Sequence, residues 1–372
     1  MAKPGIGSES AENEVTNEVS LKREETDQKD KEELNVRNEQ NTDKEGKAME
    51  EKTTKKSAHE KETESLKTVE SQKANVEPTT EISKKRKTEE EDTPKKAKQT
   101  QQEIVADHYN KREVFTVETR QQTKTFNLRK FNNWVKAVLI NIFVRNGDRV
   151  LDLGCGKGGD VMKWTKAQVS QVVGIDIAEQ SIEEARKRSA EARLNSDFIV
   201  GNPFKTSLTE IYDGSLFFNA VSCQFAFHYA FESELSLKTA LKNISTALSK
   251  DGVFFCTVPY YREILKRIGN SLECANEFYK IRFETKPDPE VLGAKYFFTL
   301  EEALDDCPEY LVNPYVLEKY AEEFNLKIMS YNSFPDFFNA NHKRYKDLLY
   351  KMKVLHPLDL KPSEREVIGN LV

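Results

Sequence analysis

Apolar and polar residues succeed one another along residues 131–259 in a pattern that predicts alternating helices and strands. In FNNWVKAVLINIF (131–143) the apolar residues recur at the spacing of one helical face, which predicts an amphipathic helix that stops at Gly147. Short apolar runs predict buried strands, and segments rich in Ala, Glu and Lys predict helices. The strands are expected at 149–153, 171–176, 197–200, 217–224 and 252–259, and the other helices at 160–166, 178–192 and 235–248.

The order of these elements predicts the fold class. Strands and helices that alternate at this spacing favour an α/β fold with a doubly wound, Rossmann-like parallel sheet over an α+β domain or a barrel. Ligands of such sheets bind beyond the carboxyl ends of the strands, where the strand order reverses. We therefore expect the functional residues in the loops that follow Leu153, Asp176, Val200 and Ala220.

Composition separates the first hundred residues from this pattern. They contain no Phe, Tyr, Trp or Cys and hold 21 Lys and Arg against 25 Asp and Glu, whereas the remaining residues hold 36 against 37 and all the aromatic residues. A segment so poor in apolar side chains cannot offset a chain entropy of about 1–2 kcal/mol per residue. We expect a disordered charged tail over 1–103 and one folded domain over 104–372.

Two basic blocks, at 84–87 (KKRK) and 95–98 (KKAK), stand out within the tail. They are typical of a bipartite nuclear localisation signal or of a contact to nucleic acid. The alternative, in which they have no specific role, is a solvated chain of mixed charge. The sequence predicts a nuclear protein. It has no apolar run near the roughly 20 residues of a membrane span, and its five cysteines, without a CxxC pair, predict neither a disulfide framework nor a metal site.

A glycine-rich turn, GCGKGG (154–159), follows the first strand and satisfies the pattern G-x-G-x-x-G. The pattern alone fits a dinucleotide site, an S-adenosylmethionine site or a structural turn. Asp152 would repel a pyrophosphate but suits a cationic, amino-acid-like ligand, which favours S-adenosylmethionine. Asp176, at the end of the second strand, is placed either to accept ribose hydroxyls or to cap a helix. Lys157 lacks the flanking residues of a phosphate-loop NTPase.

Five motifs resemble those of the mRNA cap guanine-N7 methyltransferases, a family of class I S-adenosylmethionine-dependent methyltransferases, in order and spacing. They are FNNWVK (131–136), VLDLGCGKGGDVMKW (150–164), GIDIAEQSI (174–182), CQFAFHYAFE (223–232) and CPEYLV (307–312). The resemblance covers about residues 107–337. It implies that S-adenosylmethionine is the methyl donor, that S-adenosylhomocysteine is released, and that the acceptor is the 5′ cap of mRNA.

The resemblance also implies roles for individual residues. Those implied to bind S-adenosylmethionine are Lys136, Gly154, Asp176, Asn202, Gln224 and Tyr229. Those implied to bind the cap and RNA are Asn132, Asn133, Lys157, Lys163, Arg188, His228 and Glu309. The residue types suit these roles, because Lys and Arg bind phosphates, a carboxylate accepts from the guanine N1–H and amine, and His and Tyr stack on or hydrogen-bond a base.

Two features depart from the family pattern. Asn202 stands after the third strand, where the family has an acidic residue that faces the adenine; an amide oxygen can face the adenine amino group without a charge, which predicts weaker cofactor binding. The chain also ends at Val372, before a final strand that carries a cap-site aromatic residue in the family. We expect the sheet to lack that strand unless another segment closes its edge.

The implied reaction is methyl transfer to N7 of the cap guanine. Because N7 carries an unprotonated lone pair at neutral pH, we expect catalysis by positioning and electrostatics, with no residue acting as general acid or base. The expected partners are 5′-capped pre-mRNA and the transcription and capping machinery, including RNA polymerase II and the guanylyltransferase. Two alternatives remain: a small-molecule or nucleoside methyltransferase of the same fold, and a catalytically silent cap- or RNA-binding protein.

Overall fold

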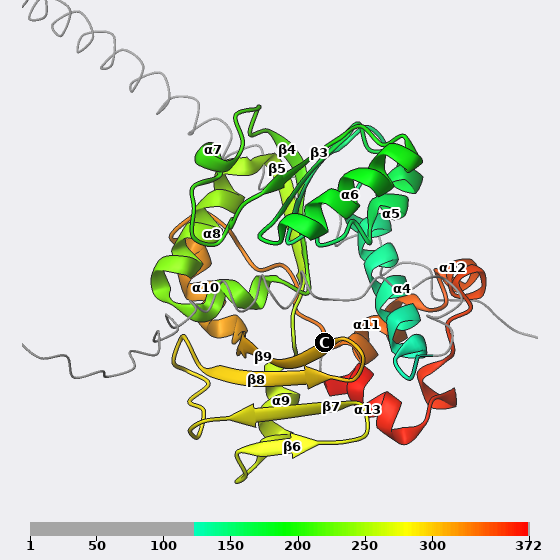
Figure 1. Cartoon of the computed structure of the whole chain (residues 1–372), viewed down its shortest axis with the longest axis vertical. Coiled ribbons are helices and arrows are strands. Elements are labelled where there is room, and N and C mark those ends of the chain that lie inside the picture. The colour runs from blue at the N-terminus through cyan, green and yellow to red at the C-terminus, as the bar shows by residue number, and fades with distance from the viewer. Residues whose placement is uncertain (1–122, 371–372) are drawn as a thin grey trace, which may run out of the picture. The chain divides into compact units, whose positions relative to one another are not determined.

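The computed structural model describes residues 123–370. The predicted disorder of the charged tail and its nuclear localisation signal lie outside the described residues. Within the described part, one parallel sheet and one antiparallel sheet form the framework, with helices packed around them (Figure 1).

The parallel sheet confirms the predicted α/β class. It consists of β1 (Arg149–Leu153), β2 (Gln171–Asp176), β3 (Ser196–Val200), β4 (Phe218–Gln224) and β5 (Leu248–Thr257). The strands lie in the order β3-β2-β1-β4-β5, and every neighbouring pair is parallel. The strand order therefore reverses between β1 and β4, and a ligand is expected beyond the carboxyl ends of these two strands. Since β4 continues to Gln224, the loop predicted after Ala220 begins four residues later than expected.

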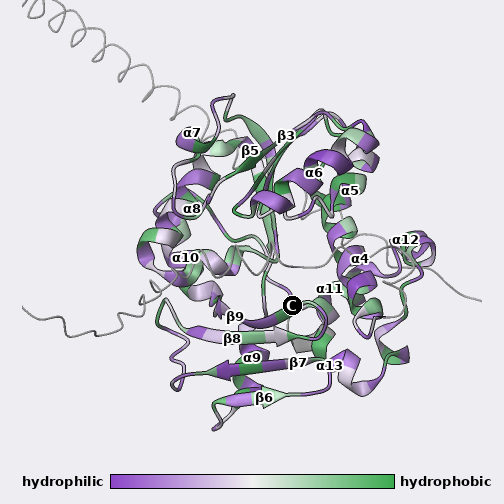
Figure 2. Cartoon of the chain, viewed as in Figure 1, coloured by the Kyte–Doolittle hydropathy of each residue, from purple (hydrophilic) through white to green (hydrophobic). Residues whose placement is uncertain are grey.

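Helices cover both faces of this sheet (Figure 1). They are α4 (Phe126–Phe143), α5 (Val161–Ala167), α6 (Glu179–Ala192), α7 (Leu208–Ile211), the 3₁₀ helix η1 (Phe227–Glu232), α8 (Glu234–Ala247) and α10 (Pro314–Glu322). Successive residues of one strand pack on opposite faces of the sheet. Val150 packs in the hydrophobic cluster that includes α4, whereas Leu151 packs in the cluster that includes α8. The parallel strands are mostly green in Figure 2, and α6 is largely purple.

The remaining helices are α9 (Tyr261–Ile268), α11 (Phe334–Asn341), α12 (Lys346–Met352), the 3₁₀ helix η2 (Pro357–Asp359) and α13 (Pro362–Asn370). Phe131 of α4 stacks on Phe338 of α11 with ring centroids 5.7 Å apart, and this aromatic contact joins α4 to the last part of the chain. No helix among residues 123–370 is long and apolar enough to cross a membrane.

The antiparallel sheet is absent from the predictions made from sequence. It contains β6 (Glu273–Ala275), β7 (Tyr279–Phe283), β8 (Lys295–Leu300) and β9 (Leu304–Tyr310), in the order β6-β7-β8-β9. A signal for it exists, because Tyr279, Ile281 and Phe283 are buried at a period of two, as in a half-buried strand. The prediction of a doubly wound sheet was therefore correct but incomplete.

Helix α4 begins at Phe126, five residues before its predicted start. The reason lies in the turn between β8 and β9, where the Glu302 carboxylate accepts hydrogen bonds from the backbone N–H of Lys124 (3.2 Å) and the hydroxyl of Thr125 (3.2 Å). A carboxylate at this position caps the positive end of a helix. The extra turn of α4 thus depends on a residue far away in sequence.

Strand β5 lies at one edge of the parallel sheet. Among residues 123–370, β5 pairs with β4 alone and forms one edge of the parallel sheet. The ring of Phe143, the last residue of α4, stacks on Phe255 of β5 with centroids 5.4 Å apart. Helix α4 therefore covers one face of this edge strand.

Candidate active site

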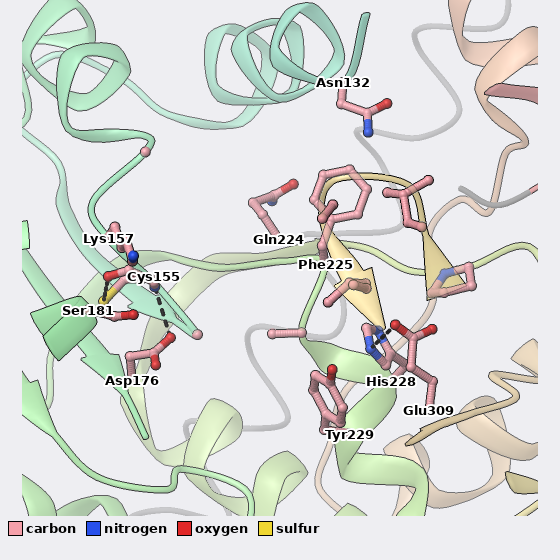
Figure 3. A pocket seen from close by; sticks show the side chains of 18 of the residues that line it. Asn132, Cys155, Lys157, Asp176, Ser181, Gln224, Phe225, His228, Tyr229 and Glu309 are labelled. Carbon is pink, nitrogen blue, oxygen red and sulfur yellow. Dashed lines mark hydrogen bonds and ion pairs between the residues drawn. The ribbon is translucent and has the colours of Figure 1, made fainter. Parts of the chain in front are cut away.

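A cavity of about 650 Å³ lies beyond the carboxyl ends of β1 and β4. Its wall also includes residues of α4, η1 and the β8–β9 hairpin. Twelve of the thirteen predicted site residues line it: Asn132, Asn133, Lys136, Gly154, Lys157, Asp176, Arg188, Asn202, Gln224, His228, Tyr229 and Glu309. Figure 3 shows Lys157 and Asp176 on one side of the pocket, His228, Tyr229 and Glu309 on the other, and Gln224 between them.

The glycine turn after β1 has the geometry that requires glycine. Gly154 has a φ of +71°, and a Cβ atom added there would lie 2.4 Å from the Cβ of Ala226. The backbone N–H of Gly154 donates to the carbonyl of Ile175 at 2.7 Å, which holds the turn against β2. Any side chain would therefore displace the loop that forms the floor of the pocket.

Asp176 orders the same turn from the end of β2. Its two carboxylate oxygens accept from the backbone N–H of Gly156 (2.8 Å) and of Ala178 (2.9 Å). Burial raises the pKa of Asp176, and the backbone donors oppose that rise. The backbone N–H of Ile177 also donates to this carboxylate, which has about four acceptor positions and so keeps room for a further donor. The carboxylate thus combines the local capping role with the capacity to accept ribose hydroxyls.

Asn202 lines the pocket after β3, at the position predicted to face the adenine. Its side-chain oxygen accepts from the backbone N–H of Phe204 at 3.0 Å, forming a tight local turn. The oxygen that was expected to meet the adenine amino group is therefore shared with the protein backbone, and its second lone pair is what it can offer a ligand.

A buried carboxylate with two lysines joins α4 to α5. Asp160 accepts from Nζ of Lys136 at 2.8 Å and from Nζ of Lys163 at 2.6 Å. Burial by itself would raise the pKa of Asp160, but the two lysines outweigh it and lower this pKa to about 2. The cluster fixes Lys136, a predicted cofactor residue, in one position.

Lys163 is the predicted site residue that does not line the cavity. Its Nζ also donates to the side-chain oxygen of Asn133 at 2.8 Å, so its hydrogen-bonding capacity is used within the protein. The geometry therefore makes Lys163 a residue that positions Asn133 and Asp160, and does not support the predicted direct contact with the cap triphosphate. Asp160 was missed, although an acid three residues before a lysine is a recognisable helical pair.

Two other predicted cations do reach the cavity. Lys157 belongs to the glycine turn, and Arg188 is held on α6 by Glu184, with Nε to Oε1 at 3.0 Å. Lys205, which was not predicted, also lines the cavity and forms an ion pair with Glu232 at 2.6 Å. These three cations in the cavity wall suit a phosphate chain, since Arg and Lys are the side chains that bind phosphate.

The opposite end of the site contains a buried histidine and a buried glutamate. His228 is 2% exposed, and neither of its ring nitrogens has a hydrogen-bond partner. Its Nε2 lies 3.6 Å from Oε1 of Glu309. Burial lowers the pKa of His228 to about 3 and raises that of Glu309 to about 7, where a hydrogen bond from Tyr296 opposes the rise.

Buried polar groups are normally hydrogen-bonded, so the two ring nitrogens of His228 suit a polar ligand. A neutral imidazole offers one donor and one acceptor, and a carboxylate offers acceptors only. A planar base edge that presents two N–H donors would satisfy Glu309, which is the pattern of guanine.

Sequence comparisons identify the family of the chain. A family model, described as the mRNA (guanine-N(7))-methyltransferase domain, matches residues 92–367. The mRNA cap guanine-N(7) methyltransferase of Schizosaccharomyces pombe is 38% identical over 270 residues, which cover 68% of this chain and 75% of that protein. The chain belongs to the mRNA cap guanine-N7 methyltransferase family.

Other members and solved structures extend the comparison. The mRNA cap guanine-N(7) methyltransferase 1 of Arabidopsis thaliana is 38% identical over 258 residues, covering 64% of this chain and 70% of that one. A crystal structure of an S-adenosylmethionine-dependent methyltransferase from Clostridium acetobutylicum matches 54% of this chain and 82% of its own, at 18% identity and a TM-score of 0.40.

Two residues add to the predicted site of this cap methyltransferase. Asp152 is 4% exposed, and burial followed by the nearby charge of Asp160 raises its pKa to about 7. Phe225 lines the cavity with a φ of +60°, an uncommon conformation for a residue with a side chain. Gln224 beside it is held on both sides, by Ser222 at 3.1 Å and Thr257 at 3.2 Å.

Proposed function

We propose that this cap methyltransferase transfers the methyl group of S-adenosylmethionine to N7 of the 5′ guanine cap of mRNA, with no general base. One observation carries the assignment of the two ends of the pocket. The buried His228, whose two ring nitrogens have no hydrogen-bond partner, lies beside Glu309 at one end, while the glycine turn and Asp176 form the other. The first end suits a guanine edge, and the second suits an adenosine with an amino-acid chain.

The residues at the glycine turn fit the methyl donor. Gly154 leaves room for close backbone approach, Asp176 would accept the ribose hydroxyls, and the buried carboxylate of Asp152 suits an ammonium group. Gln224, Tyr229 and Lys136 would complete this end. When bound, S-adenosylmethionine supplies an electrophilic methyl group on a sulfonium.

The chemistry at the guanine requires no proton transfer. The N7 lone pair forms the new bond to the methyl carbon while the carbon–sulfur bond breaks, which gives S-adenosylhomocysteine and a guanine with a positive charge. Holding the reactants in line contributes about 7–11 kcal/mol to lowering the barrier. The carboxylate of Glu309 would stabilise the positive charge as it develops on the base.

His228 has a positioning role in this mechanism. Burial holds its pKa at about 3, so the imidazole is neutral at the pH at which the reaction runs. A neutral imidazole can hydrogen-bond or stack on the base without repelling the developing charge. A base that accepts a proton during the reaction would instead need a pKa nearer to neutrality.

A transfer assay with isotopically labelled S-adenosylmethionine tests the proposal. The acceptors are GpppG-capped RNA, the dinucleotide GpppA and free GTP, and the product is identified as N7-methylated guanine. Methylation of capped RNA in preference to GTP supports the proposal. Methylation of other small molecules alone would favour the alternative small-molecule enzyme, and cap binding without methyl transfer would favour a silent binding protein. Glu309→Gln should lose activity, whereas Glu301→Gln, at an exposed position, should not.

The cellular setting is part of the same proposal. We propose that the acceptor is 5′-capped pre-mRNA, that the protein works in the nucleus beside RNA polymerase II and the guanylyltransferase, and that residues 1–103 form an addressing tail attached to a catalytic domain over 104–372. Removal of residues 84–98 should abolish the nuclear accumulation of a fluorescent fusion. Unchanged accumulation would contradict the role of the two basic blocks.

A further inference from the structure

Tyr296 lies behind the predicted guanine-reading carboxylate and was not among the predicted site residues. Its hydroxyl donates to Oε2 of Glu309 at 2.6 Å, and both side chains are at most 3% exposed. Tyr296 itself does not line the cavity. It therefore acts on whatever occupies the site through Glu309 alone, and any role it has in the reaction is a positioning role.

The sheet sets this contact rigidly. Tyr296 of β8 and Glu309 of β9 are direct partners across the antiparallel ladder, and Phe283 of β7 is the partner of Tyr296 on the other side. The rings of Phe283 and Tyr296 pack with centroids 5.6 Å apart. Side chains of such cross-strand partners are held close together. The phenol therefore has a fixed position from which to orient the carboxylate.

The two oxygens of Glu309 have different surroundings. Oε2 receives the Tyr296 hydroxyl, while Oε1 faces Nε2 of His228 at 3.6 Å. The titratable groups that face the carboxyl group are His228 and Tyr229 of η1, Tyr296 of β8 and Cys307 of β9, whose Sγ lies 3.5 Å from the Tyr229 hydroxyl. None of these four is a cation while His228 is neutral. The Tyr296 hydrogen bond thus opposes the protonation that burial favours at the Glu309 carboxylate.

The protonation state of this carboxyl group decides which base it can read. An ionised carboxylate accepts at both oxygens and matches the two donors of guanine, N1–H and the exocyclic amine. A protonated carboxyl group donates once and accepts once, which matches the acceptor N1 and the donor amine of adenine. Loss of the ionised form therefore weakens guanine binding and removes a basis for rejecting adenine.

We infer that Tyr296 is a specificity-determining positioning residue, which keeps Glu309 ionised and oriented so that the site selects guanine over adenine. The inference rests on the proposed function of the site as a guanine-cap methyltransferase. It adds that the selectivity depends on a residue that touches neither substrate nor cofactor.

The test compares full-length wild type with Tyr296→Phe between pH 6 and pH 9. The substrate is GpppA, and ApppA serves as the inhibitor that lacks guanine. Loss of this hydrogen bond to a charged group should raise the KM for GpppA at pH 7 about tenfold or more, with a smaller change in kcat. At pH 9, where the Glu309 carboxyl group ionises without help, the KM should return toward the wild-type value. ApppA should inhibit the variant more strongly than the wild type at pH 7.

Tyr279→Phe is the matched control. Tyr279 lies on β7 of the same sheet, is 3% exposed, and donates to Glu366 at 2.7 Å, but does not line the cavity. Its loss should leave the KM for GpppA and its pH profile unchanged. Affinity for S-adenosylhomocysteine, measured by calorimetry, should be the same in both variants and the wild type.

The outcomes separate the two proposals. A wild type that methylates no guanine cap overturns the proposed function. The inference on Tyr296 is overturned under either of two results, provided that the wild type methylates GpppA. In the first, the KM of Tyr296→Phe for GpppA depends on pH in parallel with that of the wild type. In the second, it matches that of Tyr279→Phe. Recovery of KM at high pH in Tyr296→Phe alone supports it, since a merely structural defect would not be reversed by pH.

Discussion

Replacing Glu309 by glutamine should stabilise the free protein at alkaline pH while it abolishes activity. The glutamine amide has nearly the same shape as the carboxylate, and its oxygen can still accept from Tyr296. Unlike the carboxylate, it is uncharged at a position where the Glu309 residue is only 3% exposed. Burial raises the pKa of Glu309 from 4.5 to about 7. The folded protein therefore holds this proton more tightly than the unfolded chain does.

The sign and size of the effect follow from linkage. Between pH 4.5 and about pH 7 the folded state binds more protons than the unfolded state, so the free energy of unfolding falls as the pH rises through this window. Over the whole window the ionised carboxylate costs the wild type about 3 kcal/mol, and glutamine escapes this cost. Relative to wild type, Glu309→Gln should thus gain about 2–3 kcal/mol between pH 5 and pH 8.

Urea unfolding at pH 5 and pH 8 measures this difference. Trp134 and Trp164 are both buried and report the loss of the fold by fluorescence, and equal m-values in both proteins make the free energies comparable. Glu366→Gln is the control, because Glu366 also accepts from a tyrosine but is paired with Arg267, so its loss should lower stability at pH 8. A difference between wild type and Glu309→Gln that is the same at both pH values would refute the reasoning.

Three further changes test other parts of the site. Gly154→Ala places a Cβ 2.4 Å from that of Ala226 at a φ of +71°, and should weaken S-adenosylhomocysteine binding at least about tenfold in calorimetry; unchanged affinity would show that the turn adapts. Asp160→Asn leaves two buried lysines without a carboxylate and should cost about 2–3 kcal/mol in urea unfolding at pH 7, a difference that disappears below about pH 2, where Asp160 itself is protonated. Glu302→Ala removes the cap of α4 and should cost about 0.5–2 kcal/mol, with faster hydrogen exchange in the first turn of the helix, whereas the exposed Glu301→Ala should cost less.

Local pattern was enough to predict the elements of the parallel sheet. The strands at 149–153 and 171–176 lie where their apolar runs predicted, because a strand buried on both faces consists mostly of apolar residues. The glycine turn was also predictable, since a positive φ and a close contact leave glycine as the residue that fits. Twelve of the thirteen residues assigned to the site from motif positions also line one cavity.

The second sheet and the start of α4 were harder to predict for a physical reason. Strands β6 to β9 are short and connected antiparallel, and the half-buried pattern of β7 spans only Tyr279–Phe283. Helix α4 gains its first turn from Glu302, more than 170 residues later in the chain. Lys163 was assigned to the cap from its motif position, but its Nζ donates to Asp160 and Asn133, and Lys163 itself does not line the cavity.

Residues close together in the chain are sufficient to specify the alternation of strands and helices, the glycine turn and the motifs of the family, because each of these is a local pattern. Tertiary structure alone decided the charge of the site. Glu309, His228 and Asp152 have ordinary side chains whose pKa values move mainly because packing removes water from around them. Burial is a property of the assembled chain, and it depends on strands such as β8, whose Tyr296 lies opposite Glu309 only once the sheet has formed.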